Sequence, residues 1–348
     1  MPSSDPAPSP RLSEIKVRRL SILDALPFLV SALGAACLFF RRESAPAVIL
    51  ATLILAVIPL RKAWRATSGT ALRPALVWGA LSIGLCVLAQ IVAFGESSAL
   101  GRPRSDQWIY LSVLAALAGL LTVLNARTPG GGAWAILMSL LVLVFLLPWL
   151  EGAGLARQRD GWDRLRLATP WTYFFAILVF AAITNYLPTR HGPAACVALS
   201  GFVLAGLGAS RTDWGHQVRG QAWAWVPWCW TLAIFLADFL AKVPPTKPHD
   251  ALSRVWLWFR DGWGTVWALR TKERFNRTAE LASWPIRLDW GGVVSTDGSP
   301  SPVLPDEAVA TFASLLRRFA DSETIRRQTA PELRADLAEP RPRGDYRV

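Results

Sequence analysis

The sequence predicts an all-α membrane protein: a bundle of about eight transmembrane helices, followed by a small cytoplasmic tail that is α+β or mainly helical. Of its 348 residues, 52% are hydrophobic and only 18% are charged, whereas roughly 25% of residues are charged in a soluble domain. Long runs without charge alternate with short arginine-bearing loops. Most of the net charge of +12 lies around these runs, which indicates contact with the lipid bilayer and not with nucleic acid.

Composition divides the chain into four segments. Residues 1–15 are rich in Pro and Ser and are predicted to be disordered, and residues 16–243 form the polytopic transmembrane bundle. Residues 244–328, here called the tail, begin with prolines and are soluble and rich in Trp. Residues 329–348 are charged, contain proline and are also predicted to be disordered.

Each apolar run is close to the roughly 20 residues that cross a hydrocarbon core about 30 Å thick. The runs cover residues 22–40, 45–60, 74–94, 108–126, 132–150, 171–187, 194–210 and 222–241. Several tryptophans lie at the ends of the runs, as expected at headgroup depth. The seventh run contains many Gly and Ala residues, which predicts close approach of a neighbouring helix.

The loop arginines predict the orientation. Basic residues precede the first run and follow the second, at residues 11–19 and 61–73, which favours a cytoplasmic N-terminus. Arginines in residues 157–166 conflict with this orientation, but the first helices usually dominate. We therefore expect a multi-pass protein of the cell membrane with both termini in the cytoplasm.

Polar residues within apolar runs are the candidates for an intramembrane site. Asp238 lies near the end of the last run with Lys242 at i+4, so it either forms an interfacial ion pair or binds a cation or proton. Gln90 and Asn185 are expected to supply interhelical hydrogen bonds. Asp24, at the start of the first run, is expected to be a helix cap or an interfacial residue. The four cysteines have no metal-type spacing, and neither a metal nor a cofactor is predicted.

The tail is predicted to contain a long helix over residues 250–282, an extended segment over 286–294, a linker over 295–305 and an amphipathic helix over 306–328. Its large aromatic residues are expected to form one buried surface, here called the docking face. Its members are Trp256, Phe259, Trp263, Trp267, Trp284 and Trp290. The first expectation is that the extended segment, with Trp284, Ile286 and Trp290, covers the helix and forms a small tail core with it; the inner leaflet and a protein partner are the alternatives.

The segment 259–292 is the most distinctive part of the sequence, with Phe259-Arg260-Asp261, Trp263-Gly264 and Trp290-Gly291. It resembles the tails of uncharacterised bacterial multi-pass membrane proteins, a resemblance that implies no activity. The stretch from Trp263 to Trp267 also loosely resembles the haem-handling signature of cytochrome c assembly proteins. It follows the last run and lacks the acidic continuation of that signature, so no haem is expected.

These features predict a non-enzymatic membrane scaffold or assembly factor with a docking tail. The alternative is a small-solute or ion transporter that uses Asp238. A further alternative is a membrane enzyme acting on lipid substrates, for which the charged residues of loop 159–166 are the candidates. The sequence lacks the nucleotide-binding, zinc-protease and serine-hydrolase motifs, which argues against a soluble ATPase or hydrolase.

Overall fold

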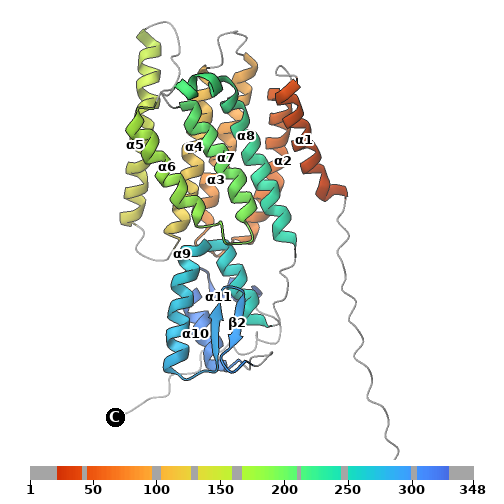
Figure 1. The fold of residues 1–348 in the computed structure, drawn as a ribbon, viewed down its shortest axis with the longest axis vertical. Helices are drawn as coiled ribbons and strands as arrows, with labels where there is room; N and C mark the ends of the chain where they lie inside the picture. Colours follow the sequence, from red (N-terminus) through yellow and green to blue (C-terminus); the bar gives the residue numbers. More distant parts are fainter. Residues whose placement is uncertain are drawn as a thin grey trace, which may run out of the picture.

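The computed structural model describes residues 22–40, 45–95, 103–126, 132–158, 167–209, 213–243, 250–298 and 304–328. The predicted disordered ends and the charged loop 159–166 lie outside these residues. The described chain contains two parts, a set of apolar helices and the tail, which packs against one end of them (Figure 1). Each part has its own hydrophobic core.

The apolar part contains helices α1 to α8, which lie side by side (Figure 1). They are α1 Ile22–Phe40, α2 Ala45–Ala66, α3 Arg73–Gly95, α4 Pro103–Leu124, α5 Gly132–Gln158, α6 Thr169–Thr184, α7 Gly192–Ala209 and α8 Asp213–Lys242. Among the described residues, five helices are long and apolar enough to cross a membrane: α2, α3, α4, α7 and α8. The apolar helical stretches in α1, α5 and α6 are shorter, so a bundle of eight transmembrane helices is not confirmed.

Several helix ends differ from the ends of the apolar runs. α2 continues to Ala66 and α5 to Gln158, past the predicted ends at residues 60 and 150. Both extensions contain good helix formers such as Ala, Arg, Leu and Gln. Hydropathy marks where a segment stops being apolar, but a helix continues as long as its backbone is hydrogen-bonded.

The small residues of the seventh run allow the close packing that was predicted. In α7, a Cβ at Gly201 would lie 2.6 Å from the Trp230 ring nitrogen of α8, and one at Gly208 would lie 3.0 Å from Trp223. Phe202 and Ala205, between these glycines, are each 2% exposed. The bulky tryptophans of α8 therefore fill the space left by the glycines of α7.

The tail consists of α9 Ala251–Leu281, β1 Ile286–Asp289, β2 Gly292–Ser295, α10 Asp306–Leu316 and α11 Ser322–Gln328. The single extended segment that we predicted is a two-stranded antiparallel hairpin, in which Ile286 pairs with Ser295 and Asp289 with Gly292. The predicted helix over 306–328 is divided into α10 and α11. The division occurs where Asp321 accepts a hydrogen bond from the Thr324 backbone N–H at 2.7 Å and so begins a new helix.

The tail has its own aromatic core, as we expected first. Trp256, Phe259 and Trp263 are each 0% exposed. Phe319, from the turn after α10, is in contact with the ring of Phe259 at a centroid distance of 4.9 Å and with Trp267 at 5.2 Å. The amphipathic face of residues 306–328 and the long helix therefore cover each other.

Candidate functional site at the junction of bundle and tail

The tail contacts the bundle at three places on one end of the apolar helices: the α2–α3 loop, the end of α4 and the α6–α7 loop (Figure 1). These contacts bring together residues that are far apart in the sequence. Because the junction contains most of the unusual polar contacts of the described chain, it is the candidate functional site.

The α2–α3 loop is joined to the turn between α10 and α11. The Asp321 backbone N–H donates to the Gly69 carbonyl at 2.9 Å, and the Thr324 hydroxyl donates to the Ser68 carbonyl at 3.0 Å. Gly69 has a φ of 74°, and a Cβ there would collide with the Asp321 carboxylate. Glycine is therefore required at this position for the loop to reach the tail.

The end of α4 contacts the second half of α9. The indole N–H of Trp267 donates to the carbonyl of Val123 at 3.1 Å. Ala126, just after α4, is part of the hydrophobic core of the tail. One member of the predicted docking face therefore contacts the bundle directly, which makes the bundle end a second cover for this face.

The α6–α7 loop holds a break in α9. Gly264 interrupts the helix with φ 77° and ψ −173°, a conformation that only glycine adopts readily. Asn185 bridges this break: its side-chain N–H donates to the Trp263 carbonyl at 3.2 Å, and its side-chain oxygen accepts from the Val266 N–H at 2.9 Å. The Asn185 backbone carbonyl also accepts the Thr265 N–H at 2.7 Å. These bonds pair backbone groups that the break would otherwise leave unsatisfied.

This placement corrects the prediction for Asn185. We predicted an interhelical hydrogen bond within an apolar run, but Asn185 is the C-cap residue of α6, beyond Thr184, and is 2% exposed. The helix ends here, and the Asn185 side-chain amide forms its hydrogen bonds with Trp263 and Val266 of the tail. The apolar run continues through Leu187, so hydropathy alone extends the helix too far.

A buried ion cluster lies beside this amide contact. Asp261 of α9 is 4% exposed and forms ion pairs with Arg190 of the α6–α7 loop at 3.1 Å and with Arg260 at 2.8 Å. Arg260 also donates to the carbonyl of Trp290 at 2.8 Å, and the Trp290 indole N–H donates to the Pro188 carbonyl at 3.0 Å. Removing one partner of such a buried pair typically destabilises a protein by about 3–5 kcal/mol.

His191 follows this cluster in the chain. Burial, reinforced by the positive charge of Arg190, lowers the pKa of His191 from 6.5 to about 4, although Asp261 acts in the opposite direction. Its Nδ1 is buried without a hydrogen-bond partner. The neutral imidazole is therefore the form that fits the junction.

The other intramembrane candidates do not join this site. Asp238 forms ion pairs with Lys242 at 2.9 Å and with Lys62 of α2 at 3.6 Å, which matches the interfacial alternative. Gln90 is buried within α3. Asp24 lies in the first turn of α1, and its side chain lies outside the described part.

The cavity between α6 and α7 also lacks these candidates. It has a volume of about 380 Å³ and is lined mainly by apolar and aromatic side chains such as Phe175, Val179 and Phe202.

Trp284 is the remaining member of the docking face. It is partly buried, and its ring centroid lies 6.1 Å from that of Phe275. Within the described residues, no group of three or more His, Cys, Asp or Glu side chains could hold a metal ion.

Sequence reasoning missed the residues that join the two parts, namely Arg190, Asp261 and Gly264. The sequence contained a signal for two of them, because Asp261 and Gly264 interrupt the aromatic pattern of the long helix. Comparisons with protein-family models, with curated protein sequences and with solved structures gave no match.

Proposed function

We propose that the protein is a non-enzymatic scaffold of the cell membrane, in which the helical bundle holds the tail in a fixed orientation at the cytoplasmic surface. The single observation that carries the proposal is the bridge from Asn185 across the break at Gly264. A merely tethered tail needs no such contact. A tail held at three places is suited to presenting a surface to other proteins at a constant height and angle.

The proposed arrangement is eight membrane crossings with both termini in the cytoplasm. An even number of crossings returns the chain to the side on which it began. The outward apolar surface supports contact with lipid: Leu29, Ile54, Ile91, Ile136 and Ile177 are each more than half exposed. Such a large exposed apolar surface is stable only against a bilayer or another apolar surface.

The scaffold fits the contacts better than the transporter does. A transported ion needs a polar site near the bilayer midplane. Asp238 instead lies near the end of α8, where two lysines neutralise it. The lipid enzyme depended on loop 159–166, which lies outside the described residues and adds no support.

The test is to cross-link and purify the tagged full chain from its native membrane in mild detergent. The matched variants are Asn185→Ala, which releases the junction, and Asn276→Ala. Asn276 makes a similar pair of amide bonds, but wholly inside the tail, to the backbone of Leu288 at 2.9 and 2.7 Å. We expect a defined set of partners with the wild type and with Asn276→Ala, and loss of that set with Asn185→Ala.

Two results would contradict the proposal. One is a partner set that does not change when the junction is released. The other is a solute or ion flux in reconstituted vesicles that Asp238→Asn abolishes, because this flux would establish the transporter.

A further inference from the structure

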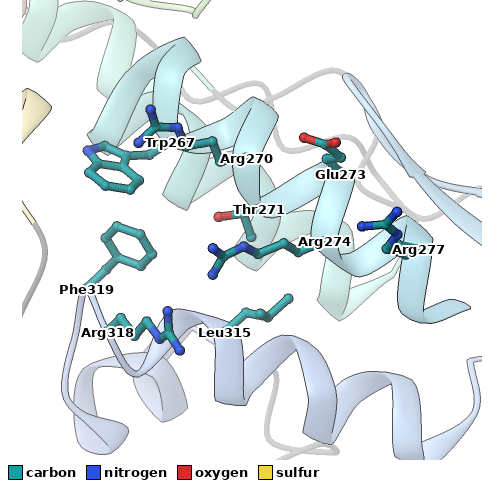
Figure 2. Close-up of a pocket in the computed structure, with 9 residues that line it drawn as sticks. All are labelled: Trp267, Arg270, Thr271, Glu273, Arg274, Arg277, Leu315, Arg318 and Phe319. Carbon is teal, nitrogen blue, oxygen red and sulfur yellow. The ribbon is translucent and has the colours of Figure 1, made fainter.

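A basic groove lies in the tail between α9 and the end of α10. It has a volume of about 310 Å³, within the range of small-molecule sites. Figure 2 shows the side chains that line it: Trp267, Arg270, Thr271, Glu273, Arg274, Arg277, Leu315, Arg318 and Phe319. The lining therefore contains four arginines, one glutamate and two aromatic rings.

The arginines are concentrated on one side of α9. Arg270, Arg274 and Arg277 follow each other at spacings of four and three residues, which places them on the same helix face. Arg274 extends between the two helices, and Arg318 lies across from it (Figure 2). Arg270 packs over the ring of Trp267, with its guanidinium carbon 5.2 Å from the ring centroid.

These arginines differ from the other basic residues of the tail. Lys272 is paired with Asp289, and Arg326 and Arg327 are paired with Glu323. In the part of the chain that the structure describes, Arg270, Arg274 and Arg277 form no ion pair, although Glu273 precedes Arg277 by four residues. Like charges at these spacings destabilise a helix, so an anion bound between them would relieve the repulsion.

We infer that this groove binds a ligand that carries two or more phosphate groups. Guanidinium groups match phosphate geometry with paired hydrogen bonds. From Arg270 to Arg277 the helix rises by about 10 Å, which is more than a single phosphate spans. Trp267 and Phe319 offer an apolar surface for the organic part of the ligand, and Thr271 adds a hydroxyl.

The groove begins at the bundle, because Trp267 donates to the Val123 carbonyl at the end of α4. A polyphosphorylated lipid headgroup and a soluble polyphosphate present the same chemistry to these residues. This inference rests on the groove alone and is independent of the scaffold proposal.

The test uses the full chain in detergent, with tripolyphosphate as the soluble probe and calorimetry as the measurement. Arg274→Gln should weaken binding by about 10- to 100-fold, the range expected for loss of hydrogen bonds to a charged group. The matched control, Arg326→Gln together with Arg327→Gln, removes more charge at a distance from the groove and should change the affinity less than about 3-fold. Arg274 and Arg327 are exposed and Arg326 is half-buried, so the variants should fold.

A second arm identifies the source of the phosphate. The chain is reconstituted in phosphatidylcholine nanodiscs with or without a bisphosphorylated phosphoinositide, and hydrogen exchange is followed over residues 267–277. Slower exchange with the lipid, lost in Arg274→Gln, would assign a lipid headgroup. Binding of tripolyphosphate without any effect of the lipid would assign a soluble ligand. If neither probe binds, or if the control pair weakens binding as much as Arg274→Gln does, the inference is overturned.

Discussion

Replacing Asn185 by alanine removes both side-chain hydrogen bonds that bridge the break in α9. The Trp263 carbonyl and the Val266 N–H would then be buried without these partners. An unsatisfied buried backbone group costs about 1–3 kcal/mol. The two together should destabilise the junction by about 2–6 kcal/mol, even though the Thr265 N–H keeps its bond to the Asn185 backbone carbonyl.

Hydrogen exchange measures this effect directly, because the protection of an amide reports the free energy of the opening that exposes it. A change of about 2–6 kcal/mol corresponds to a change in the opening equilibrium of roughly 30-fold to more than about 10,000-fold. The Val266 amide in Asn185→Ala should therefore exchange at least about 30-fold faster than in the wild type. The Leu288 amide, which Asn276 pairs at 2.7 Å, should change much less.

Asn276→Ala is the matched control and should show the opposite pattern, with fast exchange at Leu288 and little change at Val266. Equal acceleration of both amides in Asn185→Ala would indicate loss of the whole tail fold. Acceleration of Val266 by less than about 3-fold would refute the reasoning, because the amide bridge would then contribute almost nothing to docking.

Four further predictions follow from the same contacts. Gly264→Ala should release the tail to proteolysis at the junction, because the Cβ would lie within 2.6 Å of three Asn185 atoms at a φ of 77°; an unchanged cleavage pattern would contradict this. Trp263→Ala should lower tail stability by about 3–5 kcal/mol in a denaturant titration, without loss of membrane insertion. Thermal stability should be constant above about pH 7 and fall as the pH drops from 6.5 toward 4, because His191 takes up a proton at a pKa of 6.5 in the unfolded chain but only at about 4 in the folded protein, where burial lowers its pKa; His191→Gln should flatten this slope. A topology reporter fused after Val348 should be active only in the cytoplasm.

Local patterns in the sequence were enough to predict the helices and their apolar character. Runs near 20 residues without charge correspond to α1 through α8. The Gly and Ala content of one run predicted the close approach of a neighbouring helix, which the structure identifies as α8. The aromatic periodicity of residues 250–282 predicted a buried face, and Trp256 and Trp263 are fully buried. These predictions succeed because burial and transfer into lipid depend on side-chain type and spacing, which are local properties.

Boundaries and polar partners were predicted less well. The segment 286–294 alternates like one strand, but the turn at Trp290-Gly291 folds it into a hairpin. Asp238 had two open interpretations, and only the position of Lys62 on another helix, together with Lys242, favours the ion pair. The separation of residues 306–328 into two helices depends on where Asp321 meets the α2–α3 loop.

The sequence by itself determined that this protein has an apolar helical part and an aromatic tail. The free energy of removing a side chain from water depends on the apolar surface of that residue, and so it can be read from residue type alone. Only the tertiary structure decided that the two parts join at Asn185 and Asp261. Asn185 and its partner Trp263 are 78 positions apart, and the ion pair of Asp261 with the neighbouring Arg260 does not reveal that Arg190 of the α6–α7 loop pairs with the same carboxylate. Hydrogen bonds and ion pairs are directional and short-ranged, so their partners become known only when the folded chain brings them within about 3 Å of each other.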